Sequence, residues 1–199
     1  NVPENTEISL NDVSFWYEEG VKAIDHISMT IKPGTVTALV GESGGGKSTV
    51  ANLIARFWDV SDGSVTVGGV DVRDLDYSDL MKHISVAFQD TNLFKMSVAE
   101  NVAMYKPDAS RKEILEALQQ ARCEDILEKL PNGMDSVIGA KGVYLSGGEM
   151  QRIALARAIL KDAPIVLLDE ATAFADAENE YLIQKALDVL LKGKTVLMI

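Results

Sequence analysis

Cysteine and long apolar runs are what this sequence of 199 residues has least of. Its one cysteine, Cys123, has no second thiol in the chain to pair with, which favours a reducing compartment. The helical pattern around Cys123 predicts a small core residue. No segment reaches the roughly 18 apolar residues that a membrane-spanning helix needs, and no signal peptide opens the sequence. We therefore expect the chain itself to be soluble.

Positive charge is also scarce. The sequence has 19 lysines and arginines against 30 aspartates and glutamates, which gives a net charge of −11. Without a basic surface or a lysine-rich run, the chain has no electrostatic footprint for nucleic acid, and we expect no such partner. Hydrophobic residues make up 47% of the sequence, enough for a folded core, so a disordered chain is excluded.

Strand-like and helix-like patterns alternate along the sequence. Alternating or continuous apolar residues predict strands over 7–15, 24–31, 35–40, 64–67, 84–88, 165–168 and 195–199. Apolar spacings of three and four predict helices over 47–58, 77–82, 111–130, 148–160 and 178–191. This order is typical of an α/β fold with a parallel sheet and an N-terminal antiparallel β subdomain. We assign 1–89 and 161–199 to these sheets and 90–160 to an inserted helical subdomain.

A glycine-rich loop precedes the expected helix 47–58. Its residues fit the spacing G-x-x-x-x-G-K-[ST] and are Gly41, Glu42, Ser43, Gly44, Gly45, Gly46, Lys47, Ser48 and Thr49. Glycines allow backbone N–H groups to converge on a phosphate, and the helix start adds unpaired donors. Lys47 supplies charge for the β- and γ-phosphates, Ser48 a hydroxyl for Mg²⁺, and Thr49 begins the helix. A turn without a ligand is the alternative, but the full motif favours a P-loop NTPase core.

Two carboxylates follow the buried strand 165–168. Asp169 and Glu170 stand where that strand ends, and ligands of open α/β sheets gather at this edge. Asp169 is suited to the Mg²⁺ shell, and Glu170 to orienting or deprotonating an attacking water. A solvated acidic turn is the alternative interpretation.

A second glycine-rich helix start lies at 145–149. Ser146, with the N–H groups of Gly147 and Gly148, could receive a terminal phosphate with help from the helix dipole. Ser146 and Glu149 also match a capping box, so a purely structural helix start is the alternative.

Taken in order, these motifs resemble the nucleotide-binding domain of an ATP-binding cassette (ABC) transporter over essentially the whole chain. The resemblance identifies 41–49 as Walker A, Gln89 as the Q-loop residue, 145–149 as the ABC signature and 165–170 as Walker B with the catalytic glutamate. Asp176 then closes the D-loop. The segments 65–72 and 87–94 and Asn101-Val102 are most similar to exporter-type members.

This resemblance implies an ATPase with the cofactors ATP and Mg²⁺. Two such domains would pair head to tail, each ATP lying between Walker A of one and the signature of the other. Glu170, Lys47 and Gln89 would act in catalysis, and Ser48, Gln89 and Asp169 at the metal. Tyr17 matches the aromatic residue that stacks on adenine; packing within its strand is the alternative.

The implied second partner is the transmembrane domain of a transporter, which places the chain at the cytoplasmic face of a membrane. Leu93, Phe94 and Met96 are candidates for contact with that domain, or for the core of the helical subdomain. The chain begins without methionine and ends inside the apolar run 195–199, so we expect a C-terminally truncated fragment. The family's switch histidine would follow that run, and neither His26 nor His83 replaces it.

Several residues depart from the family pattern. Glu149 stands where glutamine is usual, adding a negative charge near a phosphate site unless its side chain faces away. Ala140 replaces a common glutamate, and Phe174 and Ala175 vary the D-loop. The sequence of residues 171–180 resembles that of siderophore-handling members of the family.

Two other functions stay open. The first is a soluble ABC ATPase of DNA repair or chromosome maintenance, against which the acidity and the lack of a long coiled coil between the motifs both argue. The second is a catalytically weak regulatory module, for which Glu149 is the only indication.

Overall fold

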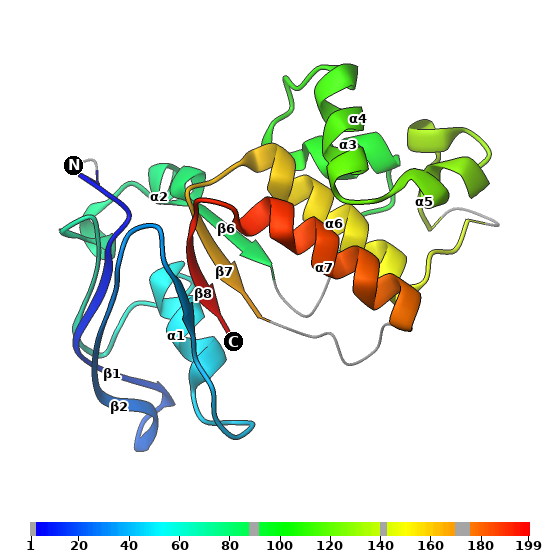
Figure 1. The fold of residues 1–199 in the computed structure, drawn as a ribbon. Helices are drawn as coiled ribbons and strands as arrows, with labels where there is room; N and C mark the ends of the chain where they lie inside the picture. Colours follow the sequence, from blue (N-terminus) through cyan, green and yellow to red (C-terminus); the bar gives the residue numbers. More distant parts are fainter. Residues whose placement is uncertain (1–2, 88–91, 140–142, 170–175) are drawn as a thin grey trace. The chain divides into compact units, whose positions relative to one another are not determined.

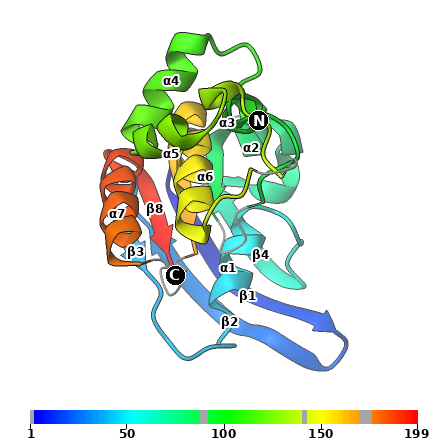
Figure 2. The same ribbon diagram turned by 90° about the vertical axis from the view of Figure 1, so that its right-hand side faces the viewer.

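The computed structural model describes residues 3–87, 92–139, 143–169 and 176–199 (Figures 1 and 2). The chain forms two compact units. The sheet unit comprises 1–86, 163–170 and 193–199, and the helical unit comprises 87–162 and 171–192. None of the helices in the described ranges is long and apolar enough to cross a membrane.

An antiparallel sheet opens the sheet unit. Its strand order is β2-β1-β4-β5, and its strands are β1 (Ile8–Glu18), β2 (Val21–Ile31), β4 (Asp62–Val67) and β5 (Val70–Asp71). β1 pairs antiparallel with both β2 and β4, and shifts in register interrupt each pairing. A short 3₁₀ helix, Val72–Asp74, follows β5. The buried side chains of β1 include Ile8, Leu10 and Val13, each at most 1% exposed.

The second sheet of this unit has the order β3-β8-β7-β6. Its strands are β3 (Val36–Ala38), β6 (Ile84–Ala87), β7 (Ile165–Leu168) and β8 (Thr195–Met198). β8 runs parallel to both β3 and β7, so the carboxyl ends of these three strands meet at one edge. Helix α1 (Lys47–Ile54) follows β3, and α2 (Tyr77–His83) precedes β6. Side chains of α1 share one hydrophobic core with both sheets.

The helical unit is organised around a long central helix. It contains α3 (Val98–Val102), α4 (Arg111–Gln120), α5 (Glu124–Lys129), α6 (Gly147–Lys161) and α7 (Ala177–Leu191), with 3₁₀ turns at Ala103–Tyr105 and Gly133–Asp135. α6 packs against α3, α4 and α7, and Figure 1 shows α6 and α7 side by side. Because α6 has neighbours on several sides, it buries even a charged residue, Arg152, which is 1% exposed.

Three helices of this unit begin with the same capping box. In α3, α4 and α6 a serine side chain accepts from the N–H three residues on, and the glutamate at that position accepts from the N–H of the serine. The pairs are Ser97 with Glu100, Ser110 with Glu113, and Ser146 with Glu149. Each box satisfies donors that the helix itself leaves unpaired.

The predicted α/β class, with an antiparallel sheet beside a parallel one, is confirmed. Two helices differ from the prediction. The expected helix 111–130 is two helices, because Arg122 adopts a left-handed conformation (φ 58°) and α5 begins after Cys123, its N-cap residue. The expected helix 47–58 ends at Ile54, since Arg56 (φ 54°) turns away to donate to the carbonyl oxygens of Val72 and Leu75.

Candidate functional site

The glycine loop connects β3 to α1 in the sheet unit. Gly46 is the N-cap of α1, with a φ of 83° and no side chain to cap the helix. A Cβ at this position would lie 2.6 Å from the carbonyl oxygen of Ala23, so only glycine fits. Because the cap has no side chain, the N–H groups of the first turn of α1 stay available to a ligand.

Lys47, the first residue of α1, turns back over this loop. Its Nζ donates to the carbonyl oxygens of Gly41, at 2.9 Å, and Glu42, at 2.5 Å. The charged amine thus lies among the loop residues without a carboxylate partner among the described residues. Such an amine can exchange these carbonyl contacts for phosphate oxygens.

Ser48 and Asp169, which lie 121 residues apart in sequence, are in direct contact. The Ser48 hydroxyl donates to Oδ2 of Asp169 at 2.9 Å. Asp169 directly follows β7, and Ser48 lies in the first turn of α1, so both stand at the carboxyl edge of the parallel sheet. The structure therefore brings two of the three predicted magnesium ligands together beside Lys47, and the third, Gln89, lies outside the described residues.

Tyr17, the candidate adenine contact, lies near the end of β1. Its hydroxyl is 3.1 Å from the hydroxyl oxygen of Thr49, the third residue of α1. Its ring packs edge to face with Phe15, at 4.7 Å between centroids, and with Trp58, at 5.5 Å. Tyr17 is still 49% exposed. Sequence analysis missed Trp58, because no spacing links it to Tyr17.

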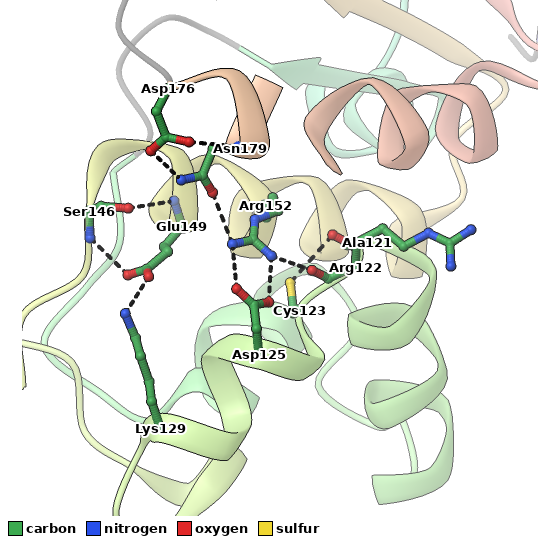
Figure 3. A network of polar contacts seen from close by, with 10 residues as sticks. All are labelled: Ala121, Arg122, Cys123, Asp125, Lys129, Ser146, Glu149, Arg152, Asp176 and Asn179. Atoms are coloured by element: carbon green, nitrogen blue, oxygen red, sulfur yellow. Dashed lines mark hydrogen bonds and ion pairs between the residues drawn. The ribbon is translucent and has the colours of Figure 1, made fainter. Parts of the chain in front are cut away.

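The second candidate anion site, Ser146 to Gly148, opens α6 in the helical unit. Ser146 Oγ accepts from the Glu149 N–H at 3.2 Å, and Glu149 Oε2 accepts from the Ser146 N–H at 2.9 Å (Figure 3). The capping box that the sequence left as an alternative is therefore formed. The N–H groups of Gly147 and Gly148 belong to the first turn, and an added Cβ at Gly147 would meet open space.

Gly148 has a second, structural reason to be glycine. A Cβ at this position would lie 2.7 Å from both Cβ and Cγ of Asn179 on α7. Glycine therefore sets how closely the start of α6 approaches α7. The sequence gives no sign of this contact, because it depends on the packing of two helices.

Arg152, one turn further along α6, joins three helices (Figure 3). Its guanidinium donates to both carboxylate oxygens of Asp125, at 2.6 and 2.9 Å, to the Arg122 carbonyl oxygen and to Asn179 Oδ1 at 2.9 Å. The hydrogen bonds from Arg152 lower the pKa of Asp125. Burial by itself would lower the pKa of Arg152, but Asp125 raises it, so the guanidinium stays charged.

Asn179 extends this network to the end of the predicted D-loop. Its backbone N–H and its Nδ2 donate to the two carboxylate oxygens of Asp176, at 2.9 and 3.0 Å. These hydrogen bonds lower the pKa of Asp176. Asp176 is thus the N-cap of α7. Hydrogen bonds through Asn179 and Arg152 link Asp176 to α5. Sequence analysis did not predict this network.

Some predicted residues lie outside the described residues. These are the catalytic candidates Gln89 and Glu170 and the variant positions Ala140, Phe174 and Ala175. His26 lies within β2, with Nδ1 2.9 Å from Asp12 Oδ1, and His83 ends α2.

Comparison with known proteins identifies the family of this chain. The family described as ABC transporter matches residues 24–173. The chain is 50% identical to the mycobactin import ATP-binding/permease protein IrtA of Mycolicibacterium thermoresistibile over 96% of its own length and 21% of the relative. It is 46% identical to the ATP-dependent lipid A-core flippase of Vibrio cholerae over 98% of its own length and 34% of the relative.

A plant protein is a third relative. The chain is 47% identical to ABC transporter B family member 28 of Arabidopsis thaliana over 97% of its own length and 28% of the relative. It thus spans about a fifth to a third of the length of these curated relatives. The family resemblance drawn from the motifs is confirmed: the chain belongs to the ABC transporter family, as an ATP-binding domain of that family.

Proposed function

We propose that this chain binds MgATP on the glycine loop and hydrolyses it, paired head to tail with a second nucleotide-binding domain, to drive transport of a solute across a membrane. The observation that carries the proposal is the Ser48–Asp169 contact beside Lys47. It gathers backbone donors, a cation and hard oxygen ligands at one sheet edge.

The residues at this edge fit Mg²⁺. A serine hydroxyl and a carboxylate are oxygen ligands, and Mg²⁺ characteristically takes its remaining ligands from water and substrate phosphates. In the described parts of the chain no cluster of three or more histidine, cysteine, aspartate or glutamate side chains forms a site of its own. Ser48 and Asp169 would thus hold an ion that arrives with ATP, and the ion would neutralise phosphate charge.

The protein's own groups supply the rest of the reaction. Lys47 and the loop N–H groups bind the β- and γ-phosphates and stabilise charge as it develops. Glu170 would position the attacking water, and Gln89 would reach the metal or that water, a role that the family resemblance implies. Tyr17 offers the adenine ring an aromatic face, and its half-exposed ring beside the start of α1 supports this role.

Pairing of two domains would complete the site. The chain has two helix starts suited to anions, one in each unit, although ATP has only one terminal phosphate. In a head-to-tail pair, Ser146, Gly147 and Gly148 of one copy receive the γ-phosphate bound by Lys47 of the other. This arrangement gives both starts a role in one reaction.

The membrane partner is a transmembrane domain, for which the name of the ATP-binding/permease relative gives support. Phe94 is 50% exposed, and its backbone N–H and carbonyl both bond to the buried side chain of Asn101. An apolar side chain held outward on a fixed backbone suits docking, with Leu93 and Met96 beside it. Relatives named for mycobactin import and for lipid A-core flipping both match nearly the whole of this chain, over 192 and 197 residues, so the domain supplies a step common to both. The mycobactin name supports a siderophore-handling role.

Substitution of Lys47 tests the binding step. Lys47→Ala should weaken MgATP binding to the chain on the order of 100-fold, since it removes a charge-assisted phosphate contact. Calorimetric titration measures this, with Lys32→Ala as the control, because Lys32 is an exposed lysine of the same unit. Equal affinity of the two variants would contradict the proposal.

Substitution of Glu170 tests the chemical step. In the full-length protein, Glu170→Gln should keep ATP binding and stop turnover, because the amide cannot accept a proton from water. Steady-state ATPase measurements in membranes check this result. Unchanged turnover would remove Glu170 from the mechanism.

A further inference from the structure

The carboxylate of Glu149 presents a problem for the second anion site. It lies three residues after Ser146, at a helix start proposed to receive the γ-phosphate, and a free carboxylate there would repel the nucleotide. In the structure this side chain is only 13% exposed, and its Oε2 is occupied by the Ser146 N–H. The capping box therefore fixes where the charge lies but does not cancel it.

Lys129 supplies the compensating charge. It is the last residue of α5, and its Nζ forms an ion pair with Oε1 of Glu149 (Figure 3). Arg152, on the same helix as Glu149, is bound to Asp125 instead. Among the described residues, Lys129 is therefore the side-chain cation that contacts the Glu149 carboxylate.

We propose that Lys129 is a positioning residue for the signature site. It neutralises the charge of the Glu149 carboxylate where the capping box holds it, so that the N–H groups of Gly147 and Gly148 can donate to the terminal phosphate of ATP bound to a second copy. The inference rests on the proposed head-to-tail function. It gives α5, which carries none of the predicted motifs, a part in that function.

A second ion pair in the helical unit serves as a control that distinguishes this positioning role from stabilisation of a helix. Lys106 forms an ion pair with Glu113 at 2.7 Å, and Glu113 is the capping-box glutamate of α4. The lysines are similarly exposed, 41% for Lys106 and 47% for Lys129. The glutamates differ, 42% exposed for Glu113 and 13% for Glu149, so the two variants are compared in ATP-dependent association rather than in stability. If Lys129 only supported a helix cap, Lys106→Met and Lys129→Met would have equal effects on that association.

The experiment measures association of the chain in MgATP by analytical ultracentrifugation. Lys129→Met should raise the ATP concentration needed for half-maximal association about tenfold, because it leaves a carboxylate unpaired beside the phosphate. Lys129→Arg should stay within about threefold of the unmodified chain, since it keeps the charge. Lys106→Met should change association by less than about twofold, although it too removes an ion pair from a capping-box glutamate.

Glu149→Gln provides the decisive rescue. The double variant Lys129→Met with Glu149→Gln should associate within about twofold of Glu149→Gln alone, because no carboxylate is left to neutralise. A double variant as impaired as Lys129→Met overturns the proposal, and so does equality of Lys129→Met with Lys106→Met.

Lys47→Ala distinguishes failure of this inference from failure of the function on which it rests. If MgATP associates the unmodified chain and Lys47→Ala prevents this, an unaffected Lys129→Met refutes only the role of Lys129. If MgATP does not associate the unmodified chain, or if Lys47→Ala associates equally well, the head-to-tail function and the inference are both refuted.

Discussion

The two glycine-rich helix starts of this molecule are built in opposite ways. At α1 the cap is Gly46, which has no side chain, and the charged group beside it is the cation Lys47. At α6 the cap is Ser146 in a complete capping box, and the charged group is the anion Glu149, balanced by Lys129. We call the α1 start the open start, because it has no side-chain cap; it carries Lys47 and the Asp169 carboxylate that is bonded to Ser48. We call the α6 start the closed start, because it is capped and its carboxylate is paired with Lys129.

This difference indicates that the two helix starts contribute unequally to nucleotide binding. Lys47 and an uncapped first turn can hold ATP in a single copy. A capped and neutral start adds little affinity alone, but it can complete contacts to a phosphate that a second copy already holds. We therefore expect substitutions at α1 to weaken nucleotide binding strongly, and those at α6 to affect stability and association.

The largest effect is expected where the open start depends on glycine. Gly46→Ala places a Cβ 2.6 Å from the Ala23 carbonyl oxygen at a φ of 83°, and should cost roughly 3–4 kcal/mol in the free energy of unfolding. Chemical denaturation measures it. Gly20→Ala is the control, with φ of 88° but open space around it, and should cost about 1 kcal/mol. Equal losses of unfolding free energy in the two variants would show that the contact with the Ala23 carbonyl oxygen does not require glycine at position 46.

The next effect concerns the support of the closed start. Arg152→Met leaves Asp125, Asn179 and the Arg122 carbonyl without their donor, and should cost about 2–3 kcal/mol. The estimate is below that for a fully buried pair, because Asp125 is 57% exposed. Arg111→Met breaks the exposed pair with Asp135 and should cost under about 1 kcal/mol. Similar unfolding free energies for both variants would contradict the claim that Arg152 stabilises the helical unit more than an exposed ion pair does.

A smaller effect separates the two signature glycines. Gly148→Ala should cost about 1–2 kcal/mol, because the new methyl group meets Asn179 at 2.7 Å and that side chain must shift. Gly147→Ala meets nothing and should be within about 0.5 kcal/mol of the unmodified chain. Thermal unfolding of the two variants gives the difference. If both are equally stable, the start of α6 does not depend on close approach to α7.

The smallest effect is a pH dependence of the capping boxes. Hydrogen bonds from Lys106 and Ser110 lower the pKa of Glu113 from 4.5 to about 2. The stability from this lowered pKa is fully present above about pH 4.5 and is lost as the pH falls toward 2. Glu113→Gln has no carboxyl to titrate, so its unfolding free energy should fall less than that of the unmodified chain between pH 5 and pH 2.5. Parallel pH curves would contradict the capping role.

The residues at the sheet edge of the site could be predicted from the sequence, because short local motifs mark them. The spacing of 41–49 and the acidic residue after a buried strand each specify a place in a parallel α/β sheet, and their contact follows from the topology. The break at Arg122 was not predicted, because no glycine or proline marks it and the apolar spacing continues across it.

The contacts around α6 could not be predicted for a different reason. Arg152 with Asp125 and Asn179, and Glu149 with Lys129, join residues 20 to 27 positions apart on three helices. A charged side chain in an apolar helix gives no indication of its partner until helix packing brings the two together. The capping box at Ser146 was visible in the sequence, but the ion pair that neutralises it was not.

Mixing two inactive variants tests the central claim, that ATP is shared between the open start of one copy and the closed start of another. Neither Lys47→Ala, which lacks the cation, nor Ser146→Arg, which blocks the signature, should associate alone in MgATP. An equimolar mixture retains one complete composite site and should form heterodimers, detected by energy transfer between labelled copies. A mixture that stays monomeric while the unmodified chain associates would contradict the shared site.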